Sequence, residues 1–223
     1  AARALLSMSA GMARQVWQPV TGGELRGKTL AIVGCGGIGR EVGRIADAGY
    51  GMRVVGCSRP EAPPPAALPH FSAVTNDFAA AVREADFVSL HVSASPDNVR
   101  WLDRDRLACL PERSWLINTA RGSLVDESAL FAALAERRIA GAALDVFTRE
   151  PYEPADRQRD LRSLPNVILT PHVGSNTVEA NRRMAERALE NIALAGQRAF
   201  ARMDLLNPEV LAGGADAETP QSP

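Results

Sequence analysis

The sequence predicts an α/β protein built on a doubly wound parallel sheet, with helices on both faces. Short apolar runs, typical of buried parallel strands, alternate with segments whose apolar residues recur at helical spacing. The first apolar run ends in a cluster of glycines that leads directly into a helical segment. These observations predict right-handed helical crossovers between the strands, and place any ligand at the carboxyl ends of the strands.

The individual elements are expected in alternating order along the chain. The expected strands are residues 29–34, 53–57, 87–92, 114–120, 140–147 and 166–170. The expected helices are residues 1–15, 38–48, 76–85, 103–110, 126–138 and 176–200. Asp126 is a good N-cap residue, and Asn176 with Glu179 resembles a capping box. Residues 60–69 contain five prolines, so this segment is expected to be irregular and exposed.

Composition excludes several classes of partner and site. The 223-residue chain has a net charge of −1 and is 46% hydrophobic, so we expect neither nucleic acid nor an anionic membrane as partner. No apolar run reaches the roughly 18 residues of a membrane helix. The three cysteines, Cys35, Cys57 and Cys109, are scattered and odd in number. They predict free thiols in a reducing cytoplasm and no metal site.

The glycine cluster is a dinucleotide-binding fingerprint of the Rossmann type. Residues 34–39, GCGGIG, follow the first expected strand and begin a helix. Gly34 allows the tight turn, Gly36 lets the backbone approach a pyrophosphate, and Gly39 lets helix and strand pack closely. The N-terminus of the helix then faces the phosphates. The context of the motif, and not the glycines alone, predicts cofactor binding here.

Polar residues fall near the carboxyl ends of the other expected strands. They are Ser58, His91, Arg121, Asp145 and His172. Taken singly, each has an ordinary explanation, such as a surface ion pair for an arginine or a buried structural role for a histidine. Because the ends of parallel strands meet at one edge of a sheet, their common position next to a nucleotide fingerprint predicts an active site.

The order of four motifs, GCGGIG, NTARG, ALDVFTREP and TPHVG, resembles the D-isomer-specific 2-hydroxyacid dehydrogenases. The resemblance runs from about residue 4 to about residue 200. It implies that Arg121 binds the substrate carboxylate and keto oxygen, that Glu150 pairs with the catalytic histidine, and that His172 is the proton donor. It also implies an NAD(P)-dependent oxidoreductase acting on a small 2-keto or 2-hydroxy acid, such as glyoxylate or hydroxypyruvate.

The chemistry of these residues suits that reaction. Reduction of a keto acid needs a hydride on carbon and a proton on oxygen, and histidine exchanges protons near neutral pH. A neighbouring carboxylate favours the charged imidazolium, and arginine offers a planar fork of donors to a carboxylate. The resemblance adds cofactor contacts at Gly37, Ile38, Thr119, Ala120, Arg121, Asp145, His172 and Gly174.

The residues after the second strand favour NADP(H) over NAD(H). An NAD-binding domain usually places Asp or Glu about 20 residues beyond the fingerprint, where it holds the ribose hydroxyls. This chain has Ser58 and Arg59 there. Ser58 can donate a hydrogen bond to a 2′-phosphate, and Arg59 can pair with it. The alternative is that Arg59 simply faces solvent before Pro60.

The resemblance also predicts how the chain is divided. Family members begin with a substrate lobe that has no counterpart here, and the first residue is not methionine, so we expect a processed form or a fragment. Residues 1–27 are expected to form a connecting helix and loop, and residues 28–175 the dinucleotide-binding domain. Residues 176–206 are expected to form a helix returning toward the substrate lobe, and residues 207–223 a disordered tail.

Two alternatives to an enzyme remain, a non-catalytic NAD(P)-binding module such as a redox sensor, and a truncated inactive product. Retention of Arg121, Glu150 and His172 argues against a sensor, and the missing lobe argues for truncation. The sequence does not specify which acid is used. We expect a homodimer, because the first helix is rich in apolar residues and, in the family, contributes to a twofold interface.

Overall fold

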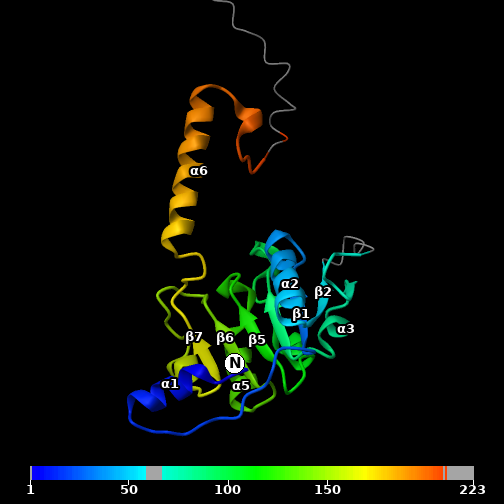
Figure 1. Cartoon of the computed structure of the whole chain (residues 1–223), viewed down its shortest axis with the longest axis vertical. Helices are drawn as coiled ribbons and strands as arrows, with labels where there is room; N and C mark the ends of the chain where they lie inside the picture. Colours follow the sequence, from blue (N-terminus) through cyan, green and yellow to red (C-terminus); the bar gives the residue numbers. More distant parts are fainter. Residues whose placement is uncertain (1, 59–66, 208, 210–223) are drawn as a thin grey trace, which may run out of the picture. The chain divides into compact units, whose positions relative to one another are not determined.

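The computed structural model describes residues 2–58, 67–207 and 209, which divide into two compact units (Figure 1). The first unit is Ala1–Gly174 and the second is Ser175–Pro223. Arg59 and most of the proline-rich segment lie outside the described residues, as does nearly all of the tail predicted from residue 207. Residues 67–69 of the proline-rich segment contain no helix or strand.

The first unit contains a seven-stranded sheet in which every pairing is parallel. The strands are β1 (Thr29–Val33), β2 (Arg53–Cys57), β3 (Ala73–Thr75), β4 (Phe87–Leu90), β5 (Trp115–Asn118), β6 (Gly141–Leu144) and β7 (Val167–Leu169). Their order is β3-β2-β1-β4-β5-β6-β7, and Figure 1 labels β2, β1, β5, β6 and β7 in this order across the sheet. The order reverses between β1 and β4, so the predicted doubly wound fold is confirmed and its switch point lies beside the fingerprint.

Helices connect the strands at the expected places. They are α1 (Leu5–Ala13), α2 (Gly37–Tyr50), α3 (Phe78–Val82), α4 (Arg104–Ala108), α5 (Glu127–Ala135) and α6 (Val178–Gly196). Single 3₁₀ turns cover Pro96–Asn98, Gly122–Leu124, Arg157–Arg159, Leu161–Ser163 and Phe200–Arg202. Asp126 caps α5 as predicted, because its side chain accepts from the N–H of Ala129.

Two details of the prediction are wrong. The edge strand β3 was not expected, because three residues are too few to show an apolar pattern. The expected capping box of Asn176 and Glu179 does not form, since Thr177 is the N-cap of α6 and its hydroxyl accepts from the N–H of Ala180. Thr177 and Asn176 are both good caps in principle, and the start of the helical backbone selects between them.

Alternation along the strands divides the core between two faces. On one face, residues of α3, α4 and α5 pack against alternate strand residues, among them Val88, Leu116 and Leu144. On the other face, α2 packs through Ala46 against Leu30, Ile32 and Val54. The two faces are therefore covered separately, as a doubly wound sheet requires.

The second face is covered only in part. Beyond β1, alternation assigns Trp115, Ile117, Ala143 and Ile168 to the face of α2, and all four are half-buried. Their strand neighbours on the opposite face, such as Leu116 and Ala142, are fully buried. The helix α1 has no buried residue, and Leu5 and Leu6 are 67% and 63% exposed. Apolar surface in this unit is thus left accessible at two places.

The second unit is a single long helix with a short return. Arg187 of α6 forms ion pairs with Glu190 and with Asp204, beyond the Phe200–Arg202 turn. Asp204 also accepts a hydrogen bond from Asn191, so the return is fixed to the helix by polar contacts. Within α6 only Leu194 is buried.

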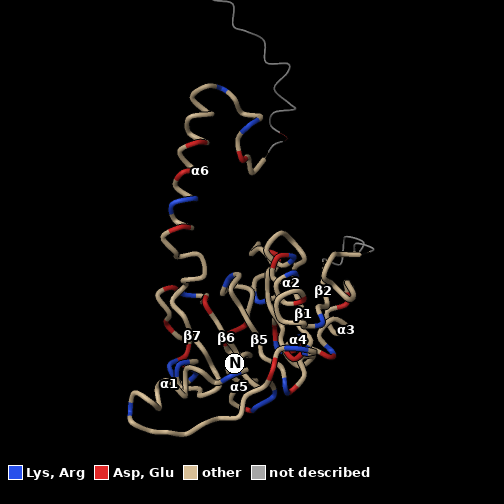
Figure 2. Tube along the Cα trace, viewed as in Figure 1, with Lys and Arg blue, Asp and Glu red and all other residues tan. Residues whose placement is uncertain are grey.

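Charge and hydropathy along the described chain show no strongly biased segment. Figure 2 shows lysine and arginine interspersed with aspartate and glutamate, in keeping with the net charge of −1. Among the described residues, no helix is both long enough and apolar enough to cross a bilayer.

Candidate active site

The turn after β1 depends on glycine at two positions. Gly34 has a φ of +100°, and a Cβ there would lie 2.5 Å from the carbonyl oxygen of His91. A Cβ on Gly39 would lie 2.1 Å from the carbonyl oxygen of Gly34, so the first turn of α2 packs directly on the turn. Both positions therefore require glycine, in the roles that the sequence predicts for them.

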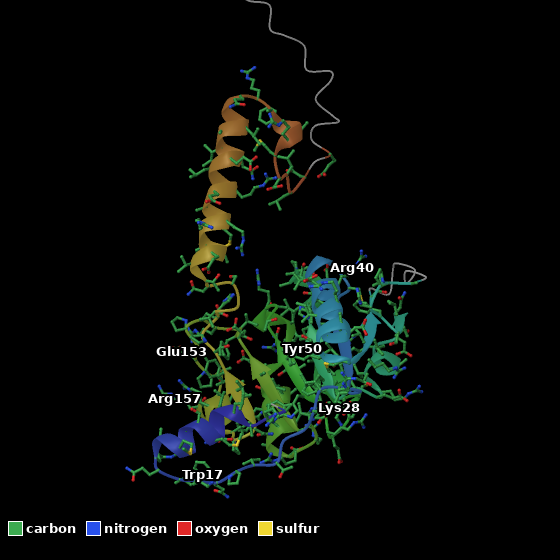
Figure 3. All side chains as sticks on the ribbon, viewed as in Figure 1. Trp17, Lys28, Arg40, Tyr50, Glu153 and Arg157 are labelled. Atoms are coloured by element: carbon green, nitrogen blue, oxygen red, sulfur yellow. The ribbon has the colours of Figure 1, made fainter. Side chains whose placement is uncertain are left out.

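The next part of the fingerprint is open. Gly36 is the N-cap of the 14-residue helix α2, and Gly37 begins it. No atom outside their neighbours lies within 4 Å of a Cβ built on either residue. Arg40 donates from Nε to the carbonyl oxygen of Cys35 at 2.9 Å, and Figure 3 shows Arg40 above Lys28, which precedes β1. An open glycine cradle at a helix N-terminus fits a pyrophosphate, so these residues fit a bound dinucleotide.

The end of β2 meets the end of β3. The N–H of Ser58 donates to the carbonyl oxygen of Thr75 at 2.9 Å, and Ser58 Oγ donates to Asn76 Oδ1 at 2.8 Å. Both side chains are half-buried. The structure thus places Ser58 at the expected strand end, with an asparagine beside it that the sequence analysis did not single out.

The NTARG turn after β5 is shaped by Asn118. Its Nδ2 donates to the carbonyl oxygen of Arg121, and its Oδ1 accepts from the N–H of Ala120, both at 3.0 Å. A Cβ on Gly122 would lie 1.9 Å from the backbone of Phe147, so the turn packs directly on the loop after β6. Asn118 is 1% exposed, and the NTARG motif by itself does not indicate this role. Its amide fixes the backbone that carries Arg121.

Asp145 organises the loop that carries His172. Its Oδ1 accepts from Thr170 Oγ1 at 2.6 Å and from the N–H of Val173 at 2.9 Å, and its Oδ2 accepts from the N–H of Gly174 at 2.8 Å. Asp145 is only 6% exposed. Burial, the largest influence, raises the pKa of Asp145, but these three hydrogen bonds together with the charge of His172 outweigh it and lower the pKa.

The clamp around Asp145 holds His172 in an unusual conformation. His172 has a φ of +52°, in the left-handed region that costs a residue with a side chain about 1–2 kcal/mol. Its neighbours Thr170, Val173 and Gly174 all donate to the same carboxylate. These bonds offset the backbone cost and fix the direction of the imidazole.

The imidazole of His172 is paired with Glu150. His172 Nδ1 donates to Glu150 Oε2 at 2.7 Å, and the N–H of Phe147 donates to Glu150 Oε1 at 3.0 Å. The hydrogen bond from His172 is the main cause of a lowered pKa for Glu150, and the Phe147 bond and the charges of His172 and Arg121 lower it further, against a smaller effect of burial. Glu150 is therefore a carboxylate at neutral pH. Because His172 uses Nδ1 to bind Glu150, its Nε2 atom can exchange a proton with a substrate.

The predicted catalytic residues thus come together from three loops. His172 and Glu150 are in contact, and the charge of Arg121 is near enough to lower the pKa of Glu150. Arg121 is exposed, with Nη1 donating to the carbonyl oxygen of Ala120 at 2.6 Å. The carboxyl edge of the sheet thus carries a cation on one loop and an imidazole paired with a carboxylate on two others.

Other strand-end residues have different surroundings. A hydrogen bond of 2.9 Å joins the ring of His91 to Ser89, and burial lowers the pKa of His91, so this ring is neutral at pH 7. Thr119 is exposed, and Ile38 is 73% exposed at the start of α2. Within the described part of the chain, no group of three or more His, Cys, Asp or Glu side chains could hold a metal ion.

One hollow of the first unit lies away from this edge. It measures about 640 Å³ and is lined by residues 112, 113, 137, 139 and 140, at the amino ends of β5 and β6. That is the edge of the sheet opposite the fingerprint. The chemistry of the carboxyl edge, and not the size of a hollow, therefore identifies the site.

Comparisons with known proteins agree with this geometry. The family described as "D-isomer specific 2-hydroxyacid dehydrogenase, NAD binding domain" matches residues 1–174. A glyoxylate reductase from Thermococcus litoralis is 40% identical over 197 residues, which are 87% of this chain and 57% of the relative. A hydroxypyruvate reductase from Thermotoga maritima is 36% identical over 196 residues, 86% of this chain and 60% of the relative.

A solved structure of a reductase has a similar fold. An acyclic imino acid reductase in complex with NADPH and D-Arg has a TM-score of 0.76 and 28% sequence identity, and the match covers 88% of this chain and 61% of that one. The chain therefore spans about 57–60% of the length of the two curated relatives described above.

The role of Asp145 as a clamp predicts a pH-dependent stability. In Asp145→Asn one carboxylate oxygen becomes an NH₂ group that cannot accept, so we expect a loss of about 1–3 kcal/mol at pH 7. Because the pKa of Asp145 is lowered by folding, its stabilisation is present above the unfolded value of about 3.9 and is lost as pH falls through the lower folded value. Thermal unfolding at pH 7, 5 and 3 should show a smaller difference between the variant and the wild type at pH 3 than at pH 7 or 5.

The exposed Asp105 supplies the matched control. Asp105→Asn should unfold at nearly the wild-type temperature at all three pH values. Equal melting temperatures of Asp145→Asn and the wild type at pH 7 would contradict the clamp.

Proposed function

This chain belongs to the D-isomer specific 2-hydroxyacid dehydrogenase family, and we propose that it is the nucleotide-binding part of an NAD(P)-dependent oxidoreductase. The proposed substrates are small 2-keto or 2-hydroxy acids such as glyoxylate or hydroxypyruvate. The observation that carries the proposal is the 2.7 Å bond between His172 and Glu150, at the sheet edge that also bears Arg121 and the glycine cradle. The reductases from Thermococcus and Thermotoga support the substrate class.

Each residue has one task in the proposed reaction. Arg121 binds the carboxylate of the keto acid through its planar fork and polarises the keto group. The nicotinamide, when bound, supplies the hydride to the carbonyl carbon. Imidazolium His172 gives its proton to the carbonyl oxygen and becomes neutral, and Glu150 stabilises the charged ring before that step. Oxidation of the hydroxy acid uses the same groups in reverse.

The cofactor is held along the carboxyl edge in this proposal. Gly34, Gly36, Gly37, Ile38 and Gly39 surround the pyrophosphate, and Ser58 and Arg59 meet the adenosine ribose. At the nicotinamide end, the contacts come from Thr119, Ala120, Arg121, Asp145, His172 and Gly174. Asp145 accepts three hydrogen bonds from the loop that carries His172, so we propose that its main role is to stabilise that loop.

We further propose that NADP(H) is preferred over NAD(H). The support is the absence of Asp or Glu at the end of β2, where Ser58 stands, and the presence of Arg59 next to it in sequence. The NADPH complex of the imino acid reductase shows that a solved relative uses this cofactor. A cytoplasmic location belongs to the same proposal, supported by three free cysteines.

The cofactor preference can be tested by fluorescence titration of the chain with NADPH and NADH. We expect a lower Kd for NADPH, because a guanidinium pairs with a 2′-phosphate and position 58 carries a serine instead of a carboxylate that would repel it. Arg59→Asp should reverse the order. Equal Kd values for the wild type, or a lower Kd for NADH, would refute the preference.

The catalytic role of His172 can be tested in a longer protein that joins this chain to a substrate lobe, because lobe closure excludes water and completes the substrate contacts. We expect His172→Ala to reduce kcat for glyoxylate or hydroxypyruvate roughly 10²–10⁴-fold through loss of proton transfer. The 223-residue chain alone should bind cofactor and turn over poorly.

The control is His70, which also bonds a carboxylate, Asp47, at 2.8 Å, but lies outside the site. His70→Gln should keep the wild-type kcat. Full activity of His172→Ala would remove His172 from the mechanism. Turnover that never appears in a longer protein, while cofactor still binds, would favour the alternative of a non-catalytic NAD(P)-binding module.

We also propose a homodimer. The half-buried residues Trp115, Ile117, Ala143 and Ile168, together with the exposed Leu5 and Leu6 of α1, offer apolar surface that a second copy could cover. Sedimentation at micromolar concentration should show a dimer, and charged substitution of Leu5 and Leu6 by Glu should shift it toward monomer. A wild-type chain that sediments only as monomer would refute this proposal.

A further inference from the structure

The pair of Ser58 and Asn76 bears on cofactor choice. Ser58 directly follows β2, and Asn76 directly follows β3, the strand that pairs with β2 through Cys57 and Thr75. The adenosine ribose of a dinucleotide lies at the end of the second strand of such a domain. Ser58 Oγ donates to Asn76 Oδ1 at 2.8 Å, so a contact between two side chains stands where the cofactor is discriminated.

The contact is held in place from both sides. The N–H of Ser58 donates to the carbonyl oxygen of Thr75, and the N–H of Asp77 donates to Thr75 Oγ1 at 3.1 Å. Asp77 in turn caps α3 by accepting from the N–H of Ala80. The backbone on either side of Asn76 is therefore fixed relative to Ser58, and the hydrogen bond between them is preorganised.

The direction of this bond decides what Ser58 offers. A serine hydroxyl has one proton to donate and two lone pairs that accept. With its proton given to Asn76, Ser58 presents lone pairs to a ligand. A ribose 2′-hydroxyl can donate to those lone pairs, whereas a 2′-phosphate dianion only accepts and would need the proton that Asn76 holds.

We propose that Asn76 is a specificity-determining residue that limits the preference for NADP(H) by binding the Ser58 proton. The inference rests on the proposed function, since it assumes dinucleotide binding at this edge. Arg59 and the missing acid favour the 2′-phosphate, and the Ser58–Asn76 bond opposes them by favouring the 2′-hydroxyl. The chain should then use both cofactors, with the ratio of their affinities set by Asn76.

The test compares Kd(NADH)/Kd(NADPH) for three chains by fluorescence titration. Asn76→Leu removes the acceptor and releases the Ser58 proton to the phosphate, so the ratio should rise about tenfold, which is about 1.4 kcal/mol. Asn76→Asp keeps the volume and the acceptor but adds a negative charge, so the ratio should fall about tenfold or more. If Asn76 only stabilised the fold, both substitutions would change the ratio of Kd values in the same way or not at all. Shifts in opposite directions therefore indicate that Asn76 determines cofactor specificity.

Two controls separate the possible failures. In a Ser58→Ala background, Asn76→Leu should leave the ratio unchanged, because no hydroxyl remains to be released, and Asn181→Leu on α6 should leave it unchanged in the wild type. A ratio unmoved by both Asn76 variants, or equal weakening of both cofactors, would overturn the inference while leaving the proposed function intact. Failure of the wild type to bind either cofactor would overturn both. Thermal unfolding identifies a variant that does not fold, and the other Asn76 variant then decides.

Discussion

Parallel pairing of all seven strands is the constraint on which the rest of this structure depends. It brings the carboxyl end of every strand to one edge, so that loops more than 100 residues apart in sequence share a site. The same pairing leaves both faces of the sheet to be covered by helices. Close packing at the edge then demands glycine where Gly34 meets His91 and where Gly122 meets Phe147.

Asp145 and Glu150 are both carboxylates at this edge, but they have different hydrogen-bond partners and different burial. Asp145 is buried and its oxygens accept three hydrogen bonds from the loop around His172, so its charge is used to shape the backbone. Glu150 is more exposed and is bound to the imidazole itself, so its charge acts on the ring. The hydrogen bonds of Asp145 to the surrounding loop stabilise the left-handed backbone conformation of His172. In this conformation the imidazole can donate from Nδ1 to Glu150.

At the end of β2, where we propose that the adenosine ribose binds, the direction of the hydrogen bond between Ser58 and Asn76 determines what Ser58 can offer a ligand. A serine at the end of β2 could serve as donor or acceptor, and its partner decides which. The end of β2 has a serine in place of the usual acid, and because Asn76 takes the proton, the hydroxyl of that serine presents lone pairs. In this proposal, Arg59 favours NADP(H) and the hydrogen bond between Ser58 and Asn76 favours NAD(H). The residues directly after β2 therefore do not predict the cofactor preference by themselves.

The sequence by itself determined the parallel α/β fold, the family and the approximate positions of the strands other than β3, because apolar runs, glycine spacing and polar motifs are local properties of the chain. It also identified Arg121, Glu150 and His172 as neighbours, through motif order and not through distance. Only the tertiary structure placed β3, moved the cap of α6 to Thr177, and showed the contacts of Asn76, Asn118 and Thr170. These features depend on contacts with other parts of the chain or on the residue at which a helix begins. Neither property produces a periodic pattern of apolar residues in the sequence.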